Sequence, residues 1–346
     1  MTFHQDLLKR FRAGNIPALA RAISIVEDER AGFQELLHEA LQEGPSVRRI
    51  GFTGPPGAGK SSLVAAAAKT FLGQGERIGV VAVDPTSPYS GGALLGDRIR
   101  MNDLATDPGI FIRSMATRGS LGGLATTTKE VLDLVDVFGF DVLLVETVGV
   151  GQTELEITAA ADTVVVVLVP ESGDAIQAMK AGLMEIADIF VVNKSDRPGA
   201  DRLVKDLRQA LHLKAGNAMK DMPAHHGVDL ARIAKEERTT DAPPIQEGGW
   251  QIPVLSTVAL TGEGVGDLLA AIDAHREWLG TSGQIEVRRR ARARVRVQDV
   301  VDRELRRVAR RSEATGGGLE PYLDQMRDGT ETAYSVAAEL LKRLLR

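Results

Sequence analysis

The sequence has no cysteine in its 346 residues, which excludes disulfide bridges, thiolate metal sites and cysteine nucleophiles. It also lacks long apolar runs, since none approaches the roughly 20 residues that a membrane-spanning helix needs. The first residues, MTFHQDLLKRFRAGN, contain neither the basic segment nor the apolar stretch and cleavage site of a secretory signal. From these absences we expect a cytoplasmic protein with no membrane partner.

The chain also has no large excess of charge of one sign. The formal net charge is −5, which does not favour a protein devoted to nucleic acid, although arginines gather near the C-terminus. Hydrophobic residues make up 43% of the chain and charged residues 26%, so the chain can bury a substantial core. This composition is typical of a globular protein with one large domain plus appendages, or with two domains.

Short apolar runs rich in Val and Ile recur through the middle of the chain, each followed by a turn that bears glycine or an acid. The runs are RIGFTG, RIGVVAVD, GIFIRS, DVLLVE, TVVVVLVP, IFVVNKSD and IPVLS. They lack clean alternation, which is typical of strands buried on both faces of a parallel sheet. Helical patterns lie between them, at 61–72, 121–138, 175–184, 200–211 and 264–279. We predict an α/β fold, a doubly wound and mostly parallel sheet flanked by helices.

Helical segments extend this α/β domain, which spans residues 49–280, at both ends. Residues 1–48 carry apolar positions at helical spacing and predict an N-terminal extension of two or three short helices. Residues 281–346 predict a C-terminal helical segment, in which the stretch TGGGLEPY breaks the first helix and a last helix covers 331–345.

A phosphate-binding motif follows the first predicted strand. The stretch Gly54-Pro55-Pro56-Gly57-Ala58-Gly59-Lys60-Ser61 matches GxxxxGK[ST] and leads into a helix that begins at Ser61 and Ser62. Glycines let backbone N–H groups converge on phosphate oxygens, the helix N-terminus adds its dipole, and Lys60 can reach the β- and γ-phosphates. The sequence therefore predicts a P-loop NTPase with Ser61 as a ligand of Mg²⁺. A glycine-rich turn without a ligand is the alternative.

A second motif indicates which base is bound. The stretch Asn193-Lys194-Ser195-Asp196 follows the run DIFVV and matches NKxD. A carboxylate at Asp196 can accept hydrogen bonds from N1–H and the exocyclic amine of guanine, a pair that adenine cannot offer. Alone, such a stretch is more typical of a polar loop, but its place at a strand end after the P-loop favours GTP. The stretch Ser256-Thr257-Val258-Ala259, after the apolar run IPVL, stands where GTPases place the loop that supports the base.

Three acids are candidates for the metal. Asp84 and Glu146 end predicted strands, and Asp97 lies in the stretch LLGDRIRM. An acid at the carboxyl end of a strand that faces the P-loop can hold Mg²⁺ directly or through water. Glu146 also begins a stretch with the spacing of the GTPase DxxG motif, in which the N–H of Gly149 would contact the γ-phosphate. For each acid, a helix cap or a solvated strand end is the alternative.

The group that orients the attacking water differs from the one in Ras-type enzymes. Val150 follows Gly149, where Ras-type enzymes carry a glutamine, so hydrolysis must use another side chain. The candidates are Asp97, Asp84 and Gln152, and we favour Asp97 because its long, glycine-containing loop could close over the nucleotide. Lys60, Asp97 and Asp84 are the predicted catalytic residues, and Gln152 lies at the start of a predicted switch segment.

These segments together resemble the MeaB/ArgK family, GTPases associated with adenosylcobalamin-dependent methylmalonyl-CoA mutase and related acyl-CoA mutases. The resemblance covers nearly the whole chain. It rests on the stretches ALARAISIVEDE, GFTGPPGAGKSS, VAVDPTSPYSGGALLGDRIRM, FIRSMATRGSLGGLA, DVLLVETVGVGQTE, NKSD and MRDGTETAYSVAAELL.

The resemblance implies a function, partners and further site residues. Such proteins are homodimeric G-protein chaperones that bind the mutase, gate the loading of intact adenosylcobalamin, and protect or reactivate the enzyme. Their hydrolysis of GTP to GDP requires Mg²⁺, is slow alone and is stimulated by the mutase. By resemblance, Lys60, Ser61, Asp84, Asp97 and Glu146 fall on nucleotide and Mg²⁺ positions. Asp174 and Lys180 would relay the partner's signal from an additional switch, and 281–346 would be a dimerisation arm.

Other functions remain open. A metal-insertion GTPase would share both motifs, but such proteins usually carry Cys/His clusters, and here only His225 and His226 are adjacent. A P-loop kinase would transfer the γ-phosphate to an acceptor, and a purely structural module would bind GTP without turnover. The arginine-rich helix within 281–346 is more typical of a solvated or partner-binding face than of a nucleic-acid contact, so we do not expect nucleic acid as a partner.

Overall fold

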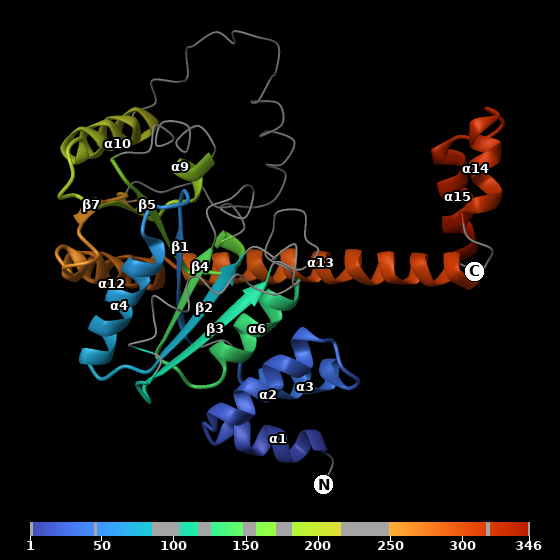
Figure 1. The fold of residues 1–346 in the computed structure, drawn as a ribbon, viewed down its shortest axis with the longest axis horizontal. Coiled ribbons are helices and arrows are strands. Elements are labelled where there is room, and N and C mark those ends of the chain that lie inside the picture. The colour runs from blue at the N-terminus through green and yellow to red at the C-terminus, as the bar shows by residue number, and fades with distance from the viewer. Residues whose placement is uncertain are drawn as a thin grey trace. The chain divides into compact units, whose positions relative to one another are not determined.

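The computed structural model describes residues 3–44, 47–84, 104, 106–116, 126–147, 157–170, 182–215, 249–315 and 319–344. The chain divides into two compact units, Met1–Arg288 and Arg289–Arg346. The first unit holds a β-sheet with helices on both of its faces, and the second is helical (Figure 1). In this described part of the chain, no helix is long and apolar enough to cross a membrane.

The sheet contains seven strands in the order β3-β2-β4-β1-β5-β6-β7. The strands are β1 (Arg48–Thr53), β2 (Ile78–Asp84), β3 (Ile110–Ala116), β4 (Val142–Thr147), β5 (Thr163–Leu168), β6 (Ile189–Asn193) and β7 (Val254–Thr257). All of their pairings are parallel. Each apolar run in the sequence forms one strand, and β4, β5 and β6 are buried at every position because helices cover both faces. The predicted fold class is confirmed.

Helices pack on both faces of this sheet (Figure 1). On one face, α4 (Lys60–Gly73) and α12 (Val265–Thr281) share a hydrophobic core with β1, β5 and β6. On the other face, α6 (Thr126–Asp136) and α10 (Ala200–Ala215) contribute to a second core. The short elements are η1 (Leu41–Glu43), η2 (Ile157–Ala159) and α9 (Met184–Ile186). The order of the strands reverses around β1, so a ligand is expected at the carboxyl end of that strand.

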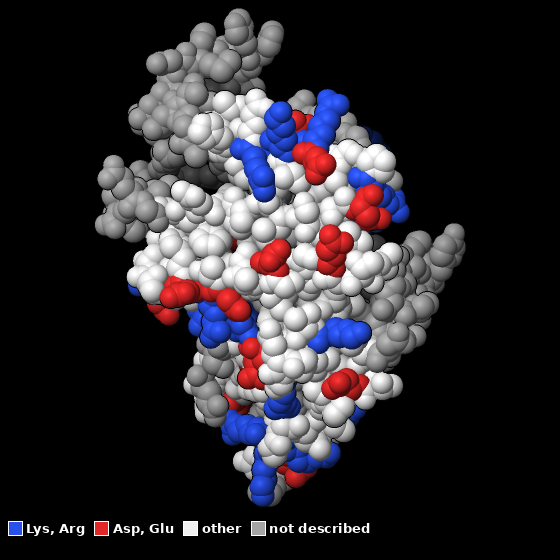
Figure 2. All heavy atoms as spheres, turned by 90° about the vertical axis from the view of Figure 1, so that its left-hand side faces the viewer, with Lys and Arg blue, Asp and Glu red and all other residues white. Residues whose placement is uncertain are grey.

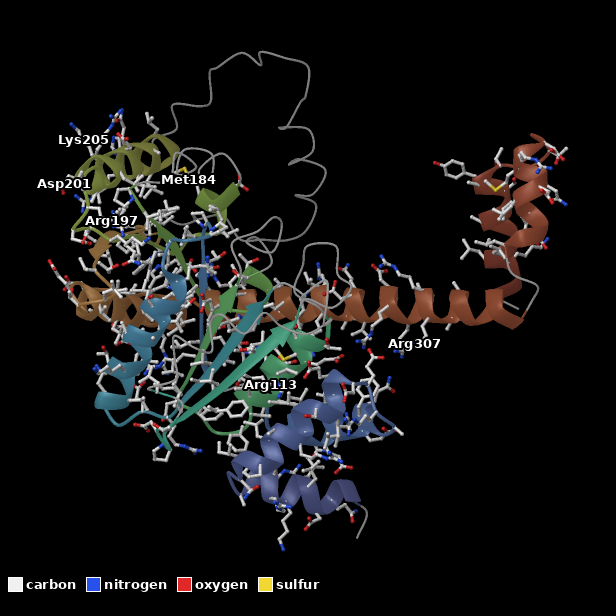
Figure 3. All side chains as sticks on the ribbon, viewed as in Figure 1. Arg113, Met184, Arg197, Asp201, Lys205 and Arg307 are labelled. Carbon is white, nitrogen blue, oxygen red and sulfur yellow. The ribbon has the colours of Figure 1, made fainter. Side chains whose placement is uncertain are left out.

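The N-terminal extension consists of α1 (Phe3–Arg12), α2 (Ile16–Glu27) and α3 (Phe33–Ala40), and it belongs to the first unit. The Asn15 side chain caps α2 by accepting a hydrogen bond from the N–H of Ala18. Helix α2 buries one face against α6, with Leu19 and Ile23 fully covered. Arg113 of β3, which Figure 3 labels, pairs with Glu27 at the end of α2. These helices therefore complete the core of the unit.

The C-terminal part begins with α13 (Gln284–Thr315), whose first five residues belong to the first unit. The sequence predicted that a break follows this helix, and α13 does end before the glycine run. Two shorter helices follow, α14 (Glu320–Arg327), which the sequence did not predict, and α15 (Ala333–Leu344). Large aliphatic side chains on α13 are exposed at Val297, Val301, Leu305 and Val308.

A chain of charged and polar side chains, most of them buried, crosses the amino-terminal edge of the sheet. We call it the amino-edge network; its members are Arg49, Asp133, Asp136, Asp162, Asp188, His275 and Arg288. The Arg49 guanidinium binds both Asp133 and Asp136, and the backbone N–H of Arg49 donates to Asp162. Arg288 donates to the carbonyl of Asp162 at 2.9 Å and makes two hydrogen bonds to the Asp188 carboxylate. The network thereby joins the first turn of α13 to β1, β5 and β6.

Two pKa values in this network are shifted. Burial alone lowers the pKa of Arg49, but the charges of Asp136 and Asp133 outweigh it and raise that pKa. Burial alone raises the pKa of Asp188, but hydrogen bonds from His275 and Arg288 lower it below its ordinary value. His275 is fully buried, with Nε2 3.3 Å from Asp188 Oδ1 and Nδ1 2.9 Å from Thr163 Oγ1. Both shifts favour the ionised forms, so the network is a set of compensated charges.

The surface carries both signs of charge. Figure 2 shows acidic and basic side chains interspersed on the face that it presents. A continuous basic surface of the kind that nucleic acid requires is not seen on that face among the described residues.

Candidate nucleotide site

The P-loop connects the end of β1 to the start of α4. Gly54 has φ of +134°, and a Cβ there would lie 2.1 Å from the carbonyl oxygen of Val167, so only glycine fits. Gly59, also with positive φ, precedes the first residue of α4 and provides no side-chain cap. The first N–H groups of α4 therefore face the loop without a side-chain acceptor at the cap, as phosphate binding requires.

Lys60 opens α4 and points back into the loop. Its ammonium group donates to the carbonyl oxygens of Gly54 at 2.9 Å and Pro55 at 3.1 Å, and the side chain is buried. These contacts hold a positive charge within the ring of backbone that the P-loop forms. A phosphate at the start of α4 would meet both the helix dipole and this ammonium group.

Ser61 and Glu146 meet beneath the P-loop. Ser61 Oγ donates a 2.6 Å hydrogen bond to Glu146 Oε1, and both residues are buried. The sheet register explains the meeting, because Glu146 pairs with Phe52 of β1 on one side and Ala82 of β2 on the other. A hydroxyl and a carboxylate are oxygen donors of the kind that Mg²⁺ prefers. Among the described residues, no cluster of three or more His, Cys, Asp or Glu side chains could hold a metal ion by itself.

The Asn193 side chain, at the end of β6, links the P-loop to the segment after β7 by hydrogen bonds, and we call this link the Asn193 brace. Its Nδ2 donates to the carbonyl of Ala58 in the P-loop at 2.9 Å. Its Oδ1 accepts hydrogen bonds from Thr257 Oγ1 at 3.2 Å and from the N–H of Ala259 at 3.1 Å. Asn193 is buried, so this one amide links the phosphate loop to the segment after β7.

Lys194 turns the chain toward the P-loop. It is one of two non-glycine residues with positive φ in the described part, at +56°, and its ammonium group donates to the carbonyl of Gly57 at 2.9 Å. The stem of Lys194 passes over Gly59, since a Cβ on Gly59 would lie 4.0 Å from Lys194 Cε. Asp196 follows in the same turn and is exposed, where a ligand can reach its carboxylate. Arg197, the next residue, is labelled in Figure 3 and locates this turn.

The stretch from Ser256 to Ala259, where the sequence placed a loop that supports the base, lies at the end of β7 and just after it. Within it, Thr257 contacts Asn193, whereas Ser256 is exposed and Val258 donates its N–H to Glu263. The second contact to Asn193 comes from Ala259, through its backbone. A backbone donor leaves no signature in residue type, so the sequence does not single out the contact from Ala259.

Several predicted residues lie outside the described residues. They are Asp97, Gly149, Val150, Gln152, Asp174, Lys180, His225 and His226. Asp84 ends β2, beside the strand that carries Glu146, but its side chain is not described. The structure thus brings together Lys60, Ser61 and Glu146, and separately Asn193, Lys194 and Thr257. Roles for the other residues stay predictions.

Known proteins similar to this chain are named as GTPases. The sequence model of the family described as methylmalonyl Co-A mutase-associated GTPase MeaB matches residues 19–314. The chain belongs to this family. A relative from Pyrococcus abyssi with the name "Putative GTPase" is 41% identical over 98% of this chain and 96% of its own length. The GTPase ArgK of Escherichia coli is 40% identical over 55% of this chain and 59% of its own length.

A mammalian relative extends the comparison. The mouse protein named methylmalonic aciduria type A homolog, mitochondrial, is 34% identical over 82% of this chain and 65% of its own length. A crystal structure of an LAO/AO transport system kinase has a TM-score of 0.68, covers 99% of this chain and 98% of its own, and is 24% identical in sequence. That structure shows the same fold. The MeaB-family chain is a GTPase, as its relatives are named.

Proposed function

We propose that this GTPase is a chaperone of an adenosylcobalamin-dependent acyl-CoA mutase, either methylmalonyl-CoA mutase or a relative of it. The observation that carries the proposal is the match of residues 19–314 to a family described as associated with methylmalonyl-CoA mutase. The name of the mouse relative, which refers to methylmalonic aciduria, supports it. In this proposal the nucleotide state gates cofactor loading and the protection or reactivation of the mutase.

The nucleotide is held at two ends. At the phosphate end, the first N–H groups of α4 and the Lys60 ammonium group bind the β- and γ-phosphates. At the base end, Asp196 accepts hydrogen bonds from N1–H and the exocyclic amine of guanine. Adenine would leave this carboxylate without matching donors, which costs more than the loss of a neutral contact. GTP and GDP are therefore the proposed ligands.

The residues present fit a magnesium ion. Ser61 Oγ and Glu146 Oε1 are 2.6 Å apart, buried and both oxygen donors, and Asp84 ends the adjacent strand. When bound, Mg²⁺ would offset negative charge on the β- and γ-phosphates. We propose that Ser61, Glu146, Asp84 and Asp97 hold the ion and that Asp97 orients the attacking water. Asp97→Ala with unchanged turnover would remove this role for Asp97.

We further propose that the protein is a homodimer whose second unit contributes the interface. The exposed fractions of Val297, Val301, Leu305 and Val308 are 62%, 49%, 61% and 47%. Their spacing of three and four residues puts them on one side of α13, and a row of exposed aliphatic side chains favours association with a second copy. Gln152, Asp174 and Lys180 are the proposed switch residues through which the mutase would sense the nucleotide.

The mutase proposal is tested by measuring GTP hydrolysis with and without the purified mutases of the same host. We expect a mutase to raise the rate and to be retained by the tagged GTPase, and Lys60→Ala to abolish hydrolysis. Release of free phosphate, rather than transfer of a radiolabelled γ-phosphate to an acceptor, separates this function from a kinase. No retention of any cobalamin-dependent mutase, with hydrolysis unaffected by all of them, would overturn the chaperone role.

The dimer proposal needs a separate measurement. Sedimentation of the full chain should give the mass of two copies, and Leu305→Asp should give that of one. The matched control is Leu213→Asp, because Leu213 is also exposed, at 55%, but lies on α10 in the first unit. A monomeric wild-type chain, or a Leu305→Asp variant that remains dimeric, would contradict the proposed interface.

A further inference from the structure

Two threonine hydroxyls meet where β1 and β4 end. Thr147 Oγ1 donates a hydrogen bond of 3.0 Å to Thr53 Oγ1, and both residues are buried. Thr53 is the last residue of β1, directly before the P-loop, and Thr147 is the last residue of β4, directly after Glu146. We call this contact the threonine pair. It lies next to both the phosphate loop and the acid proposed for the metal, and the site described above gives it no role.

The threonine pair holds β1 and β4 together at the point where their backbone pairing stops. The ladder between these two strands ends one residue before the threonines. Thr53 still pairs with Val166 of β5, and Thr147 still pairs with Val83 of β2, so each threonine stays attached to the strand on its outer side. The sheet therefore forks between β1 and β4, and the side-chain hydrogen bond spans the fork just before the P-loop begins.

The end of β4 is held on both faces of the sheet. Successive side chains of a strand point to opposite faces, so Glu146 and Thr147 do so too. Glu146 lies on the face covered by α4, where its carboxylate accepts the hydrogen bond from Ser61. Thr147 lies on the other face, which Val145 shares with the core that includes α6. A strand end held on one face alone could roll about its own axis, whereas bonds on both faces prevent that rotation.

We propose that Thr147 and Thr53 are positioning residues for GTP hydrolysis, whose hydrogen bond keeps the Glu146 carboxylate turned toward Ser61 and the metal position. The two threonines act only through Glu146 and touch neither the nucleotide nor the ion. Residues that orient a metal ligand from behind typically change metal affinity or activity about 10–100-fold when they are removed. This inference rests on the proposed role of Glu146 in holding Mg²⁺.

The effect of Thr147→Val on the full chain tests this role, because valine removes the hydroxyl with little change in shape. The Mg²⁺ concentration that half-saturates GTP hydrolysis should rise about tenfold. The KM for GTP at saturating Mg²⁺ and the affinity for GDP without metal should stay within about twofold of the wild type, since the contacts to the nucleotide are unchanged. Thr147→Ser keeps the hydroxyl and should restore the magnesium dependence to within about twofold.

Urea unfolding without nucleotide or metal separates positioning from a purely structural role. Thr53→Val and Thr147→Val each leave one hydroxyl buried without its partner, so each should lower the midpoint of unfolding. The double variant removes both hydroxyls and should recover part of this stability. Its magnesium dependence should not recover, because the hydrogen bond is still absent. A contact that served the fold alone would restore stability and magnesium dependence together.

The matched control is Thr128→Val on α6. Thr128 is fully buried, and its hydroxyl has no hydrogen-bond partner among the described residues. The same substitution there should leave the magnesium dependence of hydrolysis unchanged. An equal shift in Thr128→Val, or a double variant whose magnesium dependence recovers with its stability, would overturn the inference.

Glu146→Gln separates this inference from the proposed metal site. If Glu146→Gln leaves the magnesium dependence unchanged, the proposed role of Glu146 toward the ion fails. If Glu146→Gln raises the Mg²⁺ requirement but Thr147→Val stays within about twofold of the wild type, the inference about the threonine pair alone is overturned. A raised requirement in both variants, with Thr147→Ser close to the wild type, is the expected result.

Discussion

The Oγ of Ser61 and the Oε1 of Glu146 are 2.6 Å apart, although the two residues are separated by 85 positions in the chain. If Glu146 were an ordinary solvated strand end, its carboxylate would face water and not a residue at the start of α4. The contact forms because β4 lies next to β1, whose carboxyl end leads into the loop that carries Ser61. The contact holds the Glu146 carboxylate at the phosphate end of the site, away from solvent.

Ser61→Ala should raise the Mg²⁺ concentration that half-saturates GTP hydrolysis by about tenfold or more, because one oxygen donor and the hydrogen bond that orients Glu146 are both lost. The assay is GTPase rate against Mg²⁺ concentration. Thr70→Ala is the control, since it removes a hydroxyl from the same helix, and that hydroxyl donates to the Ala66 carbonyl within the helix. An unchanged magnesium dependence in Ser61→Ala would mean that the contact is structural.

Gly59→Ala should weaken GDP binding at least tenfold. A Cβ there would lie 2.5 Å from Asn193 Nδ2, and φ of +83° lies in the left-handed region, where a side chain costs about 1–2 kcal/mol. The Asn193 side chain would have to move, and its hydrogen bond to the Ala58 carbonyl would be disturbed. Gly73→Ala, at the other end of α4 with open space around it, should bind GDP normally in the same titration. Equal affinities for the two variants would contradict the prediction.

Asp188 should make the stability of the first unit depend on pH. Burial acts to raise the pKa of Asp188, but hydrogen bonds from His275 and Arg288 lower it below its ordinary value of 3.8. Because the folded pKa is depressed, the stabilisation is fully present above about pH 4 and is lost as the pH falls further through the folded pKa. Asp188→Asn should cost about 3 kcal/mol at pH 7 and progressively less below pH 4.

The measurement for Asp188 is urea unfolding at several pH values between 7 and 3. Asp267→Asn is the control, because Asp267 is exposed on α12 and its replacement should leave the pH profile close to that of the wild type. If the difference between wild type and Asp188→Asn stayed constant across the acid range, the carboxylate would not be the titrating group.

The N-terminal extension should behave as part of the core. Leu19 is fully buried between α2 and its neighbours, so Leu19→Ala should lower the free energy of unfolding by about 2–5 kcal/mol. Leu213→Ala, the same change at an exposed site, should cost less than about 1 kcal/mol. Denaturation that showed a separate early transition for the extension would indicate that it does not share the core of the unit.

The strands were predictable because their signal is local. Runs such as TVVVVL are too apolar to face water on either side, so a covered parallel sheet is the structure that suits them. The P-loop was predictable for a similar reason, since its glycines, lysine and serine stand at fixed spacing within one short stretch between a strand and a helix. The helical extension before β1 was also predicted from periodicity. Its packing on α6 was not, because the spacing of apolar residues shows which face of a helix is buried but not which element covers it.

The remaining features depend on register and backbone, which residue types record poorly. Ala259 contacts Asn193 through its N–H, and any residue except proline could supply that group, so the sequence indicated the loop but not this contact. The amino-edge network joins Arg49, Asp188 and Arg288, which lie in separate parts of the chain and meet only when β1, β5 and β6 align. The roles of Asp97, Gly149, Gln152, Asp174 and Lys180 stay predictions.

The brace at Asn193 has a consequence for how this protein can change. The Asn193 amide binds Ala58 of the P-loop and both Thr257 and Ala259, at the end of β7 and just after it. A residue gained or lost in the P-loop, in the turn that follows Asn193 or in the segment after β7 would therefore disturb these shared hydrogen bonds. Length variation among descendants should therefore be absent from all three loops, even where their residue types drift. A design that changes the base preference of this fold would therefore have to replace the P-loop, the turn at Asn193 and the segment after β7 together.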